Sequence, residues 1–264
     1  MYLCSIVLQL LSFLTIVPAL YSITYEDSYD DDYVGCMGKR EIQVKQGYLS
    51  CEKKQNSIFK YAWNAAETYW KNRVPPKLDR DTAIAVTAYT SNFMYSQLNV
   101  AVEGGVNQVT NRYFRSIHLL LTKAIQTLRN GKCMTTYRGI NVYIPLKRGE
   151  LFRFGRFASS SKNRNVAEGF GSKILFTIKT CFGADITQYS LHKGESEVLI
   201  PPYEEFKVTN AYLNQITLMS TGKTRSNKRC ESMSPSCPYQ QNWNTADTSS
   251  GSGSEEYWDS EYYY

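Results

Sequence analysis

The sequence predicts a domain of the α+β class, in which helices come first and strands follow. Apolar residues recur at intervals of three and four over 57–70 and 107–130, which is the spacing of an amphipathic helix. After Gly131 the chain changes to short β-rich runs separated by Gly, Pro and Asn: 134–143, 151–157, 173–180, 195–200, 206–209 and 212–219. This segregation favours helices packed beside an antiparallel or mixed sheet over an alternating, doubly wound fold.

The first predicted helix spans 57–70. Its apolar side chains recur at helical spacing: Ile58, Tyr61, Ala62, Ala65, Ala66 and Tyr69. Pro75 and Pro76 follow, and because proline cannot continue a helix we expect the helix to end before them. The next run, 82–90, alternates through Ile84, Val86 and Ala88 and predicts a strand.

The clearest helix is expected over 107–130, where one apolar stripe is formed by Tyr113, Ile117, Leu121, Ala124 and Leu128. His118 lies beside this stripe and is interpreted as a packing residue rather than a catalytic one. His192 stands alone and the chain has no Cys-x-x-Cys pair, so we expect no metal site. No Gly-x-Gly-x-x-Gly motif follows a predicted strand, which argues against a Rossmann dinucleotide site.

The first twenty residues carry no charged side chain. Their apolar run over 6–17 is shorter than the roughly 20 residues that span a bilayer. This pattern predicts a secretory signal peptide over 1–20 and therefore a secreted, extracellular protein; a membrane anchor or a buried helix is the alternative. Because the polar end of the chain lacks the hydrophobic tail of a lipid-anchor signal, we expect no membrane anchor.

Acidic, tyrosine-rich segments flank a basic centre. We expect residues 21–33 to form one disordered tail, 34–240 a single domain, and 241–264 a second, flexible tail. Ten of the 24 acidic residues lie in these tails, whereas all 30 Lys and Arg residues lie between Lys39 and Arg229. Such a centre favours anionic ligands such as pyrophosphates, acidic glycans or nucleic acid, with solubility alone as the alternative.

Six cysteines follow the predicted signal peptide: Cys36, Cys51, Cys133, Cys181, Cys230 and Cys237. An even number in a secreted chain indicates disulfide bonds. Six cysteines allow 15 pairings, however, and their spacing does not select one.

Two carboxylates and an arginine stand out as candidate site residues. Glu195 and Glu197 are two residues apart in a predicted strand, so we expect them to share a face; a solvated strand edge is the alternative. Arg138 interrupts an uncharged stretch and needs an anionic partner, which is either a phosphate or a structural carboxylate. Gly139 would let a ligand approach the backbone. Ser159 follows a predicted strand, where a hydroxyl is ordinarily a capping or turn group.

Together these residues resemble the arginine, serine and Glu-x-Glu signature of the ADP-ribosyltransferases related to cholera-type and clostridial binary toxins. Short stretches of the sequence point to a more specific family. The stretches TTYRG, FGRFASSS, AEGFG, TCFGADITQYS and GESEVLIPP resemble the vertebrate arginine-specific ecto-mono-ADP-ribosyltransferases, as do DDDYVGC, AVTAYTS and LLLTKAIQTL. The resemblance covers about residues 31–230 and does not include the acidic, tyrosine-rich tail.

This resemblance implies a fold and a set of roles. It implies a β-sandwich of two sheets with a central NAD cleft, and NAD as a co-substrate without a metal. Arg138 would hold the NAD phosphates, Ser159 would support the site, Glu197 would be the catalytic glutamate, and Glu195 would select arginine as acceptor. Gly139 would receive the nicotinamide amide, and Tyr89 and Ser190 would line the NAD site.

The resemblance also implies two disulfide pairs, Cys133 with Cys181 and Cys36 with Cys230. Cys51 and Cys237 remain and could form a third bond.

The expected activity is transfer of ADP-ribose from NAD to arginine side chains of extracellular or cell-surface acceptor proteins, with no nucleic-acid partner. An NAD glycohydrolase, which uses water as acceptor, is the first alternative. The second is a catalytically silent secreted protein that holds acidic glycans or surfaces with its basic centre.

Overall fold

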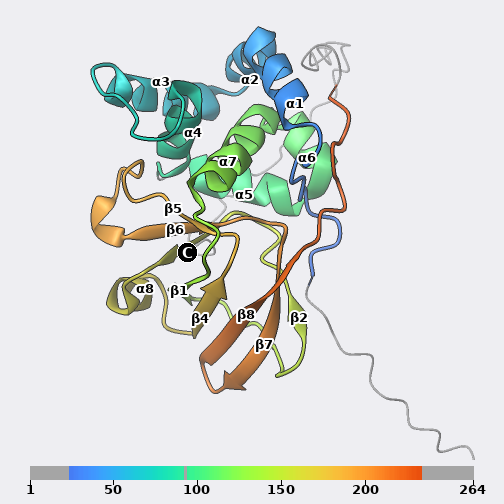
Figure 1. Ribbon diagram of the computed structural model, residues 1–264, viewed down its shortest axis with the longest axis vertical. Coiled ribbons are helices and arrows are strands. Elements are labelled where there is room, and N and C mark those ends of the chain that lie inside the picture. Colours follow the sequence, from blue (N-terminus) through green and yellow to red (C-terminus); the bar gives the residue numbers. More distant parts are fainter. Residues whose placement is uncertain (1–23, 92–93, 234–264) are drawn as a thin grey trace, which may run out of the picture.

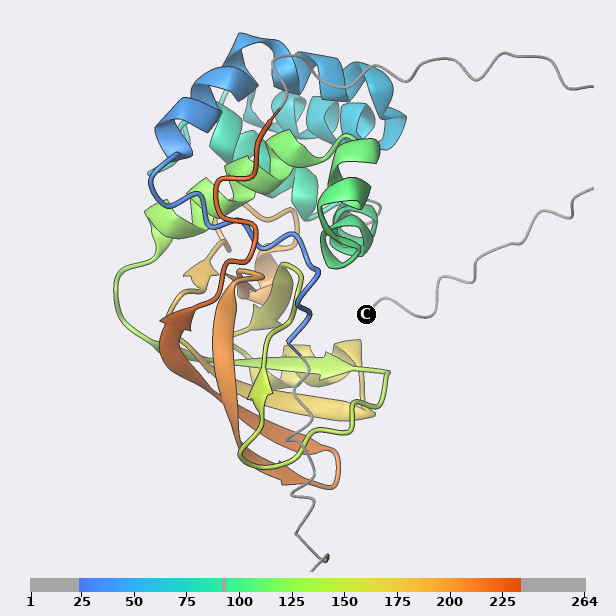
Figure 2. The ribbon, with the colours of Figure 1, turned by 90° about the vertical axis from the view of Figure 1, so that its right-hand side faces the viewer.

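The computed structural model describes residues 24–91 and 94–233, and it confirms the α+β class (Figure 1). Helices α1 to α7 gather at one end and the strands at the other, as Figures 1 and 2 show. The helical elements are α1 (Met37–Gln43), the π-helical turn η1 (Val44–Tyr48), α2 (Leu49–Gln55), α3 (Ser57–Trp70), α4 (Arg80–Tyr89), α5 (Met94–Glu103), α6 (Gly105–Asn111), α7 (Arg115–Leu128), α8 (Arg164–Phe170) and the 3-10 helix η2 (Lys193–Glu195).

The strands form one eight-stranded mixed sheet in the order β2-β7-β8-β4-β1-β3-β6-β5. The expectation of two separate sheets is therefore wrong. The strands are β1 (Met134–Ile140), β2 (Leu151–Phe152), β3 (Ala158–Ser161), β4 (Ile174–Thr180), β5 (Ala184–Asp185), β6 (Glu197–Ile200), β7 (Glu204–Tyr212) and β8 (Gln215–Thr224). All neighbours run antiparallel except β4 and β8, which are parallel.

The sheet is bent, which explains how a single sheet encloses an apolar core as a sandwich of two sheets would. β2 and β4 are three strands apart, about 14 Å in a flat sheet, yet the ring centroids of Phe152 and Phe176 lie 6.0 Å apart. These rings belong to a core enclosed by the sheet itself. A second core fills the space between the helices and β6, where Leu199 packs beneath α4 and α7.

The structure confirms the helix over 57–70 but not the strand over 82–90. In α3, the Asn56 side chain caps the first turn by accepting a hydrogen bond from Phe59 N at 2.9 Å. Residues 80–89 form helix α4 instead of a strand. All residues from Thr82 to Tyr89 are buried. A helix buried on all sides has no polar face, so its hydrophobic pattern does not distinguish a helix from a strand.

The long helix expected over 107–130 is broken into α6 and α7. Tyr113 has a φ of 59°, a left-handed conformation that no helix continues through. Glu52 caps α7 from another helix, because its carboxylate accepts hydrogen bonds from Arg115 N at 2.9 Å and Ser116 N at 2.7 Å. Burial raises the pKa of Glu52 to about 7.

Residues 24–33 are not the disordered tail that their acidity predicted. Asp30 is fully buried and forms an ion pair with the equally buried Arg153, with Nη1 and Oδ2 2.6 Å apart. Arg153 also donates to the carbonyl oxygens of Thr24 and Tyr25. Since these three partners lie more than 120 residues before Arg153, nothing local in the sequence revealed this packing.

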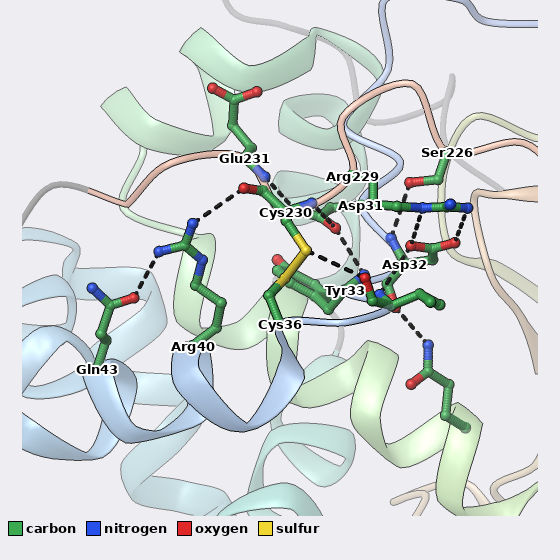
Figure 3. Close-up of a disulfide and its surroundings, with 12 residues drawn as sticks. Asp31, Asp32, Tyr33, Cys36, Arg40, Gln43, Ser226, Arg229, Cys230 and Glu231 are labelled. Atoms are coloured by element: carbon green, nitrogen blue, oxygen red, sulfur yellow. Dashed lines mark hydrogen bonds and ion pairs between the residues drawn. A yellow bond between two sulfur atoms is a disulfide. The ribbon is translucent and has the colours of Figure 1, made fainter.

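The same segment is joined to the last described residues (Figure 3). The carboxylate of Asp31 accepts hydrogen bonds from Cys230 N at 2.9 Å and Glu231 N at 3.0 Å. Asp32 pairs with Arg229 at 3.0 Å. The disulfide between Cys36 and Cys230 closes this junction covalently. The two ends of the described chain thus form one strap beside both cores.

Both disulfide pairs implied by the resemblance are confirmed: Cys36–Cys230 and Cys133–Cys181. Cys51 is also disulfide-bonded, but its predicted partner, Cys237, lies outside the described residues. So do the predicted signal peptide over 1–20 and the predicted tail over 241–264. Within the described residues, no helix is both long and apolar enough to cross a membrane.

His118 has the packing role predicted for it. It is fully buried, with Nδ1 2.9 Å from the Tyr33 hydroxyl and Nε2 2.9 Å from the Tyr29 carbonyl oxygen. Burial lowers the pKa of His118 to about 3. The segment that contains Tyr29 and Tyr33 therefore packs against a neutral imidazole.

We predict that His118→Gln flattens the fall in stability on acidification. The unfolded chain takes up a proton on this residue near its ordinary pKa of about 6.5, whereas the folded protein does so only near 3. Stability from this group is thus present above about pH 6.5 and lost as the pH falls, at about 1.4 kcal/mol per pH unit. Urea unfolding at several pH values between about 7 and 4 measures this slope. His192→Gln is the matched control, and an unchanged slope in His118→Gln would contradict the prediction.

Candidate active site

A cleft opens where strands β1, β3 and β6 meet helices α4, α5 and α8. Arg138, Gly139, Ser159, Glu195, Glu197 and Tyr89, all predicted site residues, line it together. Further lining residues are Thr90, Tyr95, Asn99, Tyr137, Arg156, Phe157, Ser160, Ser161, Ala167, Phe170 and His192. The structure thus brings together residues that are more than 100 positions apart in the chain.

The cleft lies where two central strands of the sheet, β1 and β3, pair least. β1 pairs with β4 over seven positions and β3 with β6 over four, but β1 and β3 share a single registered pair, Tyr137 with Ser161. Beyond that pair the two strands diverge. At this divergence a cleft side chain satisfies a backbone carbonyl of β3.

Arg138 occupies this divergence. Its Nη1 donates to the carbonyl oxygen of Ser159 at 2.6 Å. No carboxylate of the described residues forms an ion pair with it. Burial, and after it the positive charge of Arg156, lowers the pKa of Arg138 to about 10, so the guanidinium is still protonated at neutral pH. Arg138 thus lies beside a second cation, Arg156, and has no carboxylate partner of its own. This arrangement favours an anion in the cleft.

Glu197 begins strand β6 and is buried, with 5% of its surface exposed. Burial raises the pKa of its carboxyl, while hydrogen bonds from the Ser159 and Ser190 hydroxyls lower it. Ser159 therefore belongs to the wall of the site and is not a turn residue, since β3 includes it. Ser190 is fully buried and is not among the cleft-lining residues. Its hydroxyl thus acts on the Glu197 carboxyl without lining the cleft.

Glu195 does not belong to the strand that carries Glu197, which corrects the expectation from the Glu-x-Glu spacing. It ends the 3-10 helix η2, and Ser196, with φ 49° and ψ 47°, turns the chain before β6 begins. The Ser161 hydroxyl holds this turn by donating to the Glu195 carbonyl oxygen at 2.6 Å. Both carboxylates still line the cleft. Burial raises the pKa of Glu195, and the nearby His192 lowers it.

Packing requires a glycine at position 139, besides the access of a ligand that the sequence predicts. A Cβ atom there would lie 2.2 Å from the carbonyl oxygen of Ala167 and 2.4 Å from that of Gly171. The glycine thus lets α8 and the residue after it press against β1. This contact fixes the wall of the cleft that Ala167 and Phe170 form.

Tyr89 and Asn99 connect the helices to the strands at the back of the cleft. The Tyr89 hydroxyl donates to the Phe157 carbonyl oxygen at 3.1 Å and accepts from Asn99 Nδ2 at 3.1 Å. Asn99 Oδ1 accepts from Phe157 N at 3.2 Å. Burial raises the pKa of Tyr89 to about 12, so its hydroxyl remains a donor.

Arg156 is a cleft residue that the sequence did not single out. It forms an ion pair with Glu103 of α5, and both side chains are mostly buried. The available signal was a charged residue between two aromatic ones, Phe154-Gly155-Arg156-Phe157, just before a strand. Asn99 and Tyr95 carried no such signal, because they lie on α5 and only the tertiary fold directs them into the cleft.

Among the described residues there is no group of three or more His, Cys, Asp or Glu side chains that could hold a metal ion.

The fold, with this cleft between helices and sheet, is that of the ADP-ribosyltransferases. The crystal structure of the eukaryotic mono-ADP-ribosyltransferase ART2.2, as a variant in complex with NADH, superposes with a TM-score of 0.72 at 34% identity, covering 79% of this chain and 97% of that chain. A second ART2.2 variant, in complex with NAD, superposes equally well, with the same TM-score and identity.

The family follows from sequence comparison as well. The family model "NAD:arginine ADP-ribosyltransferase" matches residues 24–226. NAD(P)(+)--arginine ADP-ribosyltransferase 2 of Gallus gallus is 37% identical, covering 79% of this chain and 72% of the relative. Ecto-ADP-ribosyltransferase 5 of Homo sapiens is 35% identical, covering 81% of each chain. The chain belongs to the NAD:arginine ADP-ribosyltransferase family.

We predict that Gly139→Ala lowers the free energy of unfolding by about 1–3 kcal/mol, because the new methyl group would force α8 away from β1. Gly169→Ala is the matched control. Gly169 lies in α8, where an added Cβ would meet no neighbouring atom within 4 Å, and alanine favours a helix by about 1 kcal/mol over glycine. Urea unfolding of both variants measures the difference. Equal stability of the two variants would contradict this account of Gly139.

Proposed function

We propose that this protein transfers ADP-ribose from NAD to arginine side chains of acceptor proteins and releases nicotinamide. The observation that carries the proposal is the convergence of Arg138, Glu195 and Glu197 on one cleft. Membership of the NAD:arginine ADP-ribosyltransferase family supports it. So does the likeness to ART2.2, whose structures include complexes with NADH and NAD.

Arg138 is proposed to hold the NAD pyrophosphate. Its guanidinium is fixed at one end by the Ser159 carbonyl and lacks a carboxylate partner among the described residues. Arg156, which is paired with Glu103 of α5, lines the same cleft beside it. Gly139 is proposed to receive the nicotinamide amide through its backbone. Tyr89 is proposed to line the NAD site, and Ser190 to act on it through Glu197.

Glu197 is proposed to stabilise the transition state. The bond that breaks joins C1′ of the ribose to a positively charged nicotinamide, which leaves as a neutral molecule with the bonding electron pair. No acid is needed to protonate it, unlike the leaving group of an ordinary glycoside. Positive charge gathers on the ribose instead. A buried carboxylate oriented by Ser159 and Ser190 can stabilise that charge and hold a ribose hydroxyl.

Glu195 is proposed to prepare the acceptor. An arginine side chain has a pKa of roughly 12.5 or more and reaches the site protonated. As its nitrogen bonds to C1′, a proton must leave it, and Glu195 at the mouth of the cleft can orient the guanidinium and accept that proton. Partial burial raises the pKa of Glu195, which makes it a better proton acceptor than an ordinary glutamate. Its presence favours transfer to arginine over transfer to water.

We further propose that the protein acts outside the cell as a secreted enzyme. The disulfides Cys36–Cys230 and Cys133–Cys181 support this proposal, since disulfides persist in oxidising compartments. One of its relatives is named an ecto-ADP-ribosyltransferase.

We predict that Glu197→Gln abolishes both arginine transfer and NAD hydrolysis, whereas Glu195→Gln loses transfer and keeps hydrolysis. Each amide is nearly isosteric with the carboxylate it replaces but cannot stabilise positive charge or accept the proton. Incubation of the purified protein with labelled NAD and agmatine measures transfer, and release of nicotinamide without acceptor measures hydrolysis. Glu168→Gln, which alters an exposed carboxylate on α8 that pairs with Arg164, is the control. Undiminished transfer by Glu195→Gln would refute the role of Glu195.

We predict that Ser190→Ala moves the acidic limb of the pH profile of kcat/KM to higher pH. The Ser190 hydroxyl lowers the pKa of Glu197, so its loss leaves burial less opposed and the carboxylate takes up a proton at a higher pH. Activity would then fall sooner on acidification. Profiles of wild type and variant between about pH 5 and 8 test this. A raised KM for NAD with an unshifted profile would show instead that Ser190 binds NAD directly.

A further inference from the structure

A second groove lies beside the cleft, between the α3–α4 connection and the loop that precedes Glu195. Tyr69, Trp70, Arg73 and Val74 line one side of it, and Gln188 and Lys193 the other. Hydrogen bonds join the two sides. Lys77 N donates to the Tyr189 hydroxyl at 3.2 Å, and Thr87 Oγ1 donates to the Tyr189 carbonyl oxygen at 2.7 Å. These hydrogen bonds hold the two sides of the groove together.

The groove is positively charged. No acidic residue is among the residues that line it, whereas Arg73 and Lys193 line it and are exposed. Lys71 and Lys77 are exposed on the adjoining connection between α3 and α4. Within the described chain, none of these four cations forms an ion pair. The Arg73 guanidinium stacks on the Tyr69 ring at 4.3 Å from its centroid, which holds the charge at the groove. Val74 adds an apolar surface that is 90% exposed.

One short helix separates this groove from the proposed acceptor position. Lys193 and Glu195 are the two ends of η2, and Lys193 lines the groove whereas Glu195 lines the cleft. A protein whose arginine reaches Glu195 therefore brings its neighbouring residues next to Lys193 and the edge of the groove. Those neighbours meet the cationic side chains that line the groove, Lys193 and Arg73.

This charge arrangement selects among acceptors. Additional lysines or arginines beside the target arginine would be repelled by these cationic side chains, whereas aspartate or glutamate would be attracted. We propose that the groove binds the acceptor segment next to the modified arginine and favours arginines flanked by acidic side chains. This inference rests on the proposed function, and it adds the chemical class of acceptor.

The test uses two peptides with one central arginine, one flanked by Asp and Glu and the other by Asn and Gln at the same positions. For the wild-type protein, kcat/KM for the acidic peptide should exceed that for the neutral one by about fivefold at low salt, the size expected for a few exposed charge pairs. The preference should shrink towards one at high salt. In Arg73→Glu/Lys193→Glu the ratio should fall below one. Because both peptides are compared within one variant, a general loss of activity cancels.

Lys179→Glu/Lys207→Glu is the matched control, since these exposed lysines lie on β4 and β7, away from α3 and α4 (Figure 1). It should keep the wild-type ratio. Agmatine, which has no flanking residues, separates the two levels of inference. Absence of transfer to agmatine by the wild type would overturn the proposed function. Transfer to agmatine together with equal use of both peptides, or a preference that the groove variant retains, would overturn the acceptor inference alone.

Discussion

The divergence of β1 from β3 is the constraint on which the rest of the site depends. The strands share the single pair Tyr137–Ser161, and side chains satisfy two backbone carbonyls near this junction. Arg138 satisfies the Ser159 carbonyl and Tyr89 satisfies that of Phe157. An unsatisfied buried carbonyl is costly, so the same side chains that line the cleft also make the open junction stable. Support and function are therefore coupled at these positions.

A second constraint holds the helices and the sheet together. The strap formed by the two ends of the described chain combines a fully buried ion pair, Asp30 with Arg153, with a disulfide, Cys36–Cys230. The hydrogen bonds of Arg153 to backbone carbonyls matter as much as its charge, because a buried ion is tolerated only when its remaining donors are satisfied. Since the cleft is lined from both helices and strands, its geometry depends on this connection.

Positively and negatively charged side chains lie close together around the site. The cleft holds two arginines and two carboxylates, and a cationic groove with no acidic lining residue lies beyond η2. Burial raises the pKa of both carboxyls, and serine hydroxyls oppose this rise at Glu197. An anionic dinucleotide and a cationic acceptor side chain could then occupy adjacent positions, each facing charge of the opposite sign.

The sequence by itself determined the α+β class, helix α3, the packing role of His118 and six of the seven predicted site residues that line the cleft, because periodicity and local motifs carry that information. Tertiary structure alone decided what depends on distant partners. Helix α4 was mistaken for a strand because it is buried on all sides, and the acidic segment 24–33 is ordered because Arg153 and the backbone near Cys230 satisfy its carboxylates. Glu195 lies outside the strand because Ser196 turns the chain, a conformation that residue type does not reveal. A single bent sheet replaced the expected two, since hydrogen bonding between strands is long-range and leaves no local pattern.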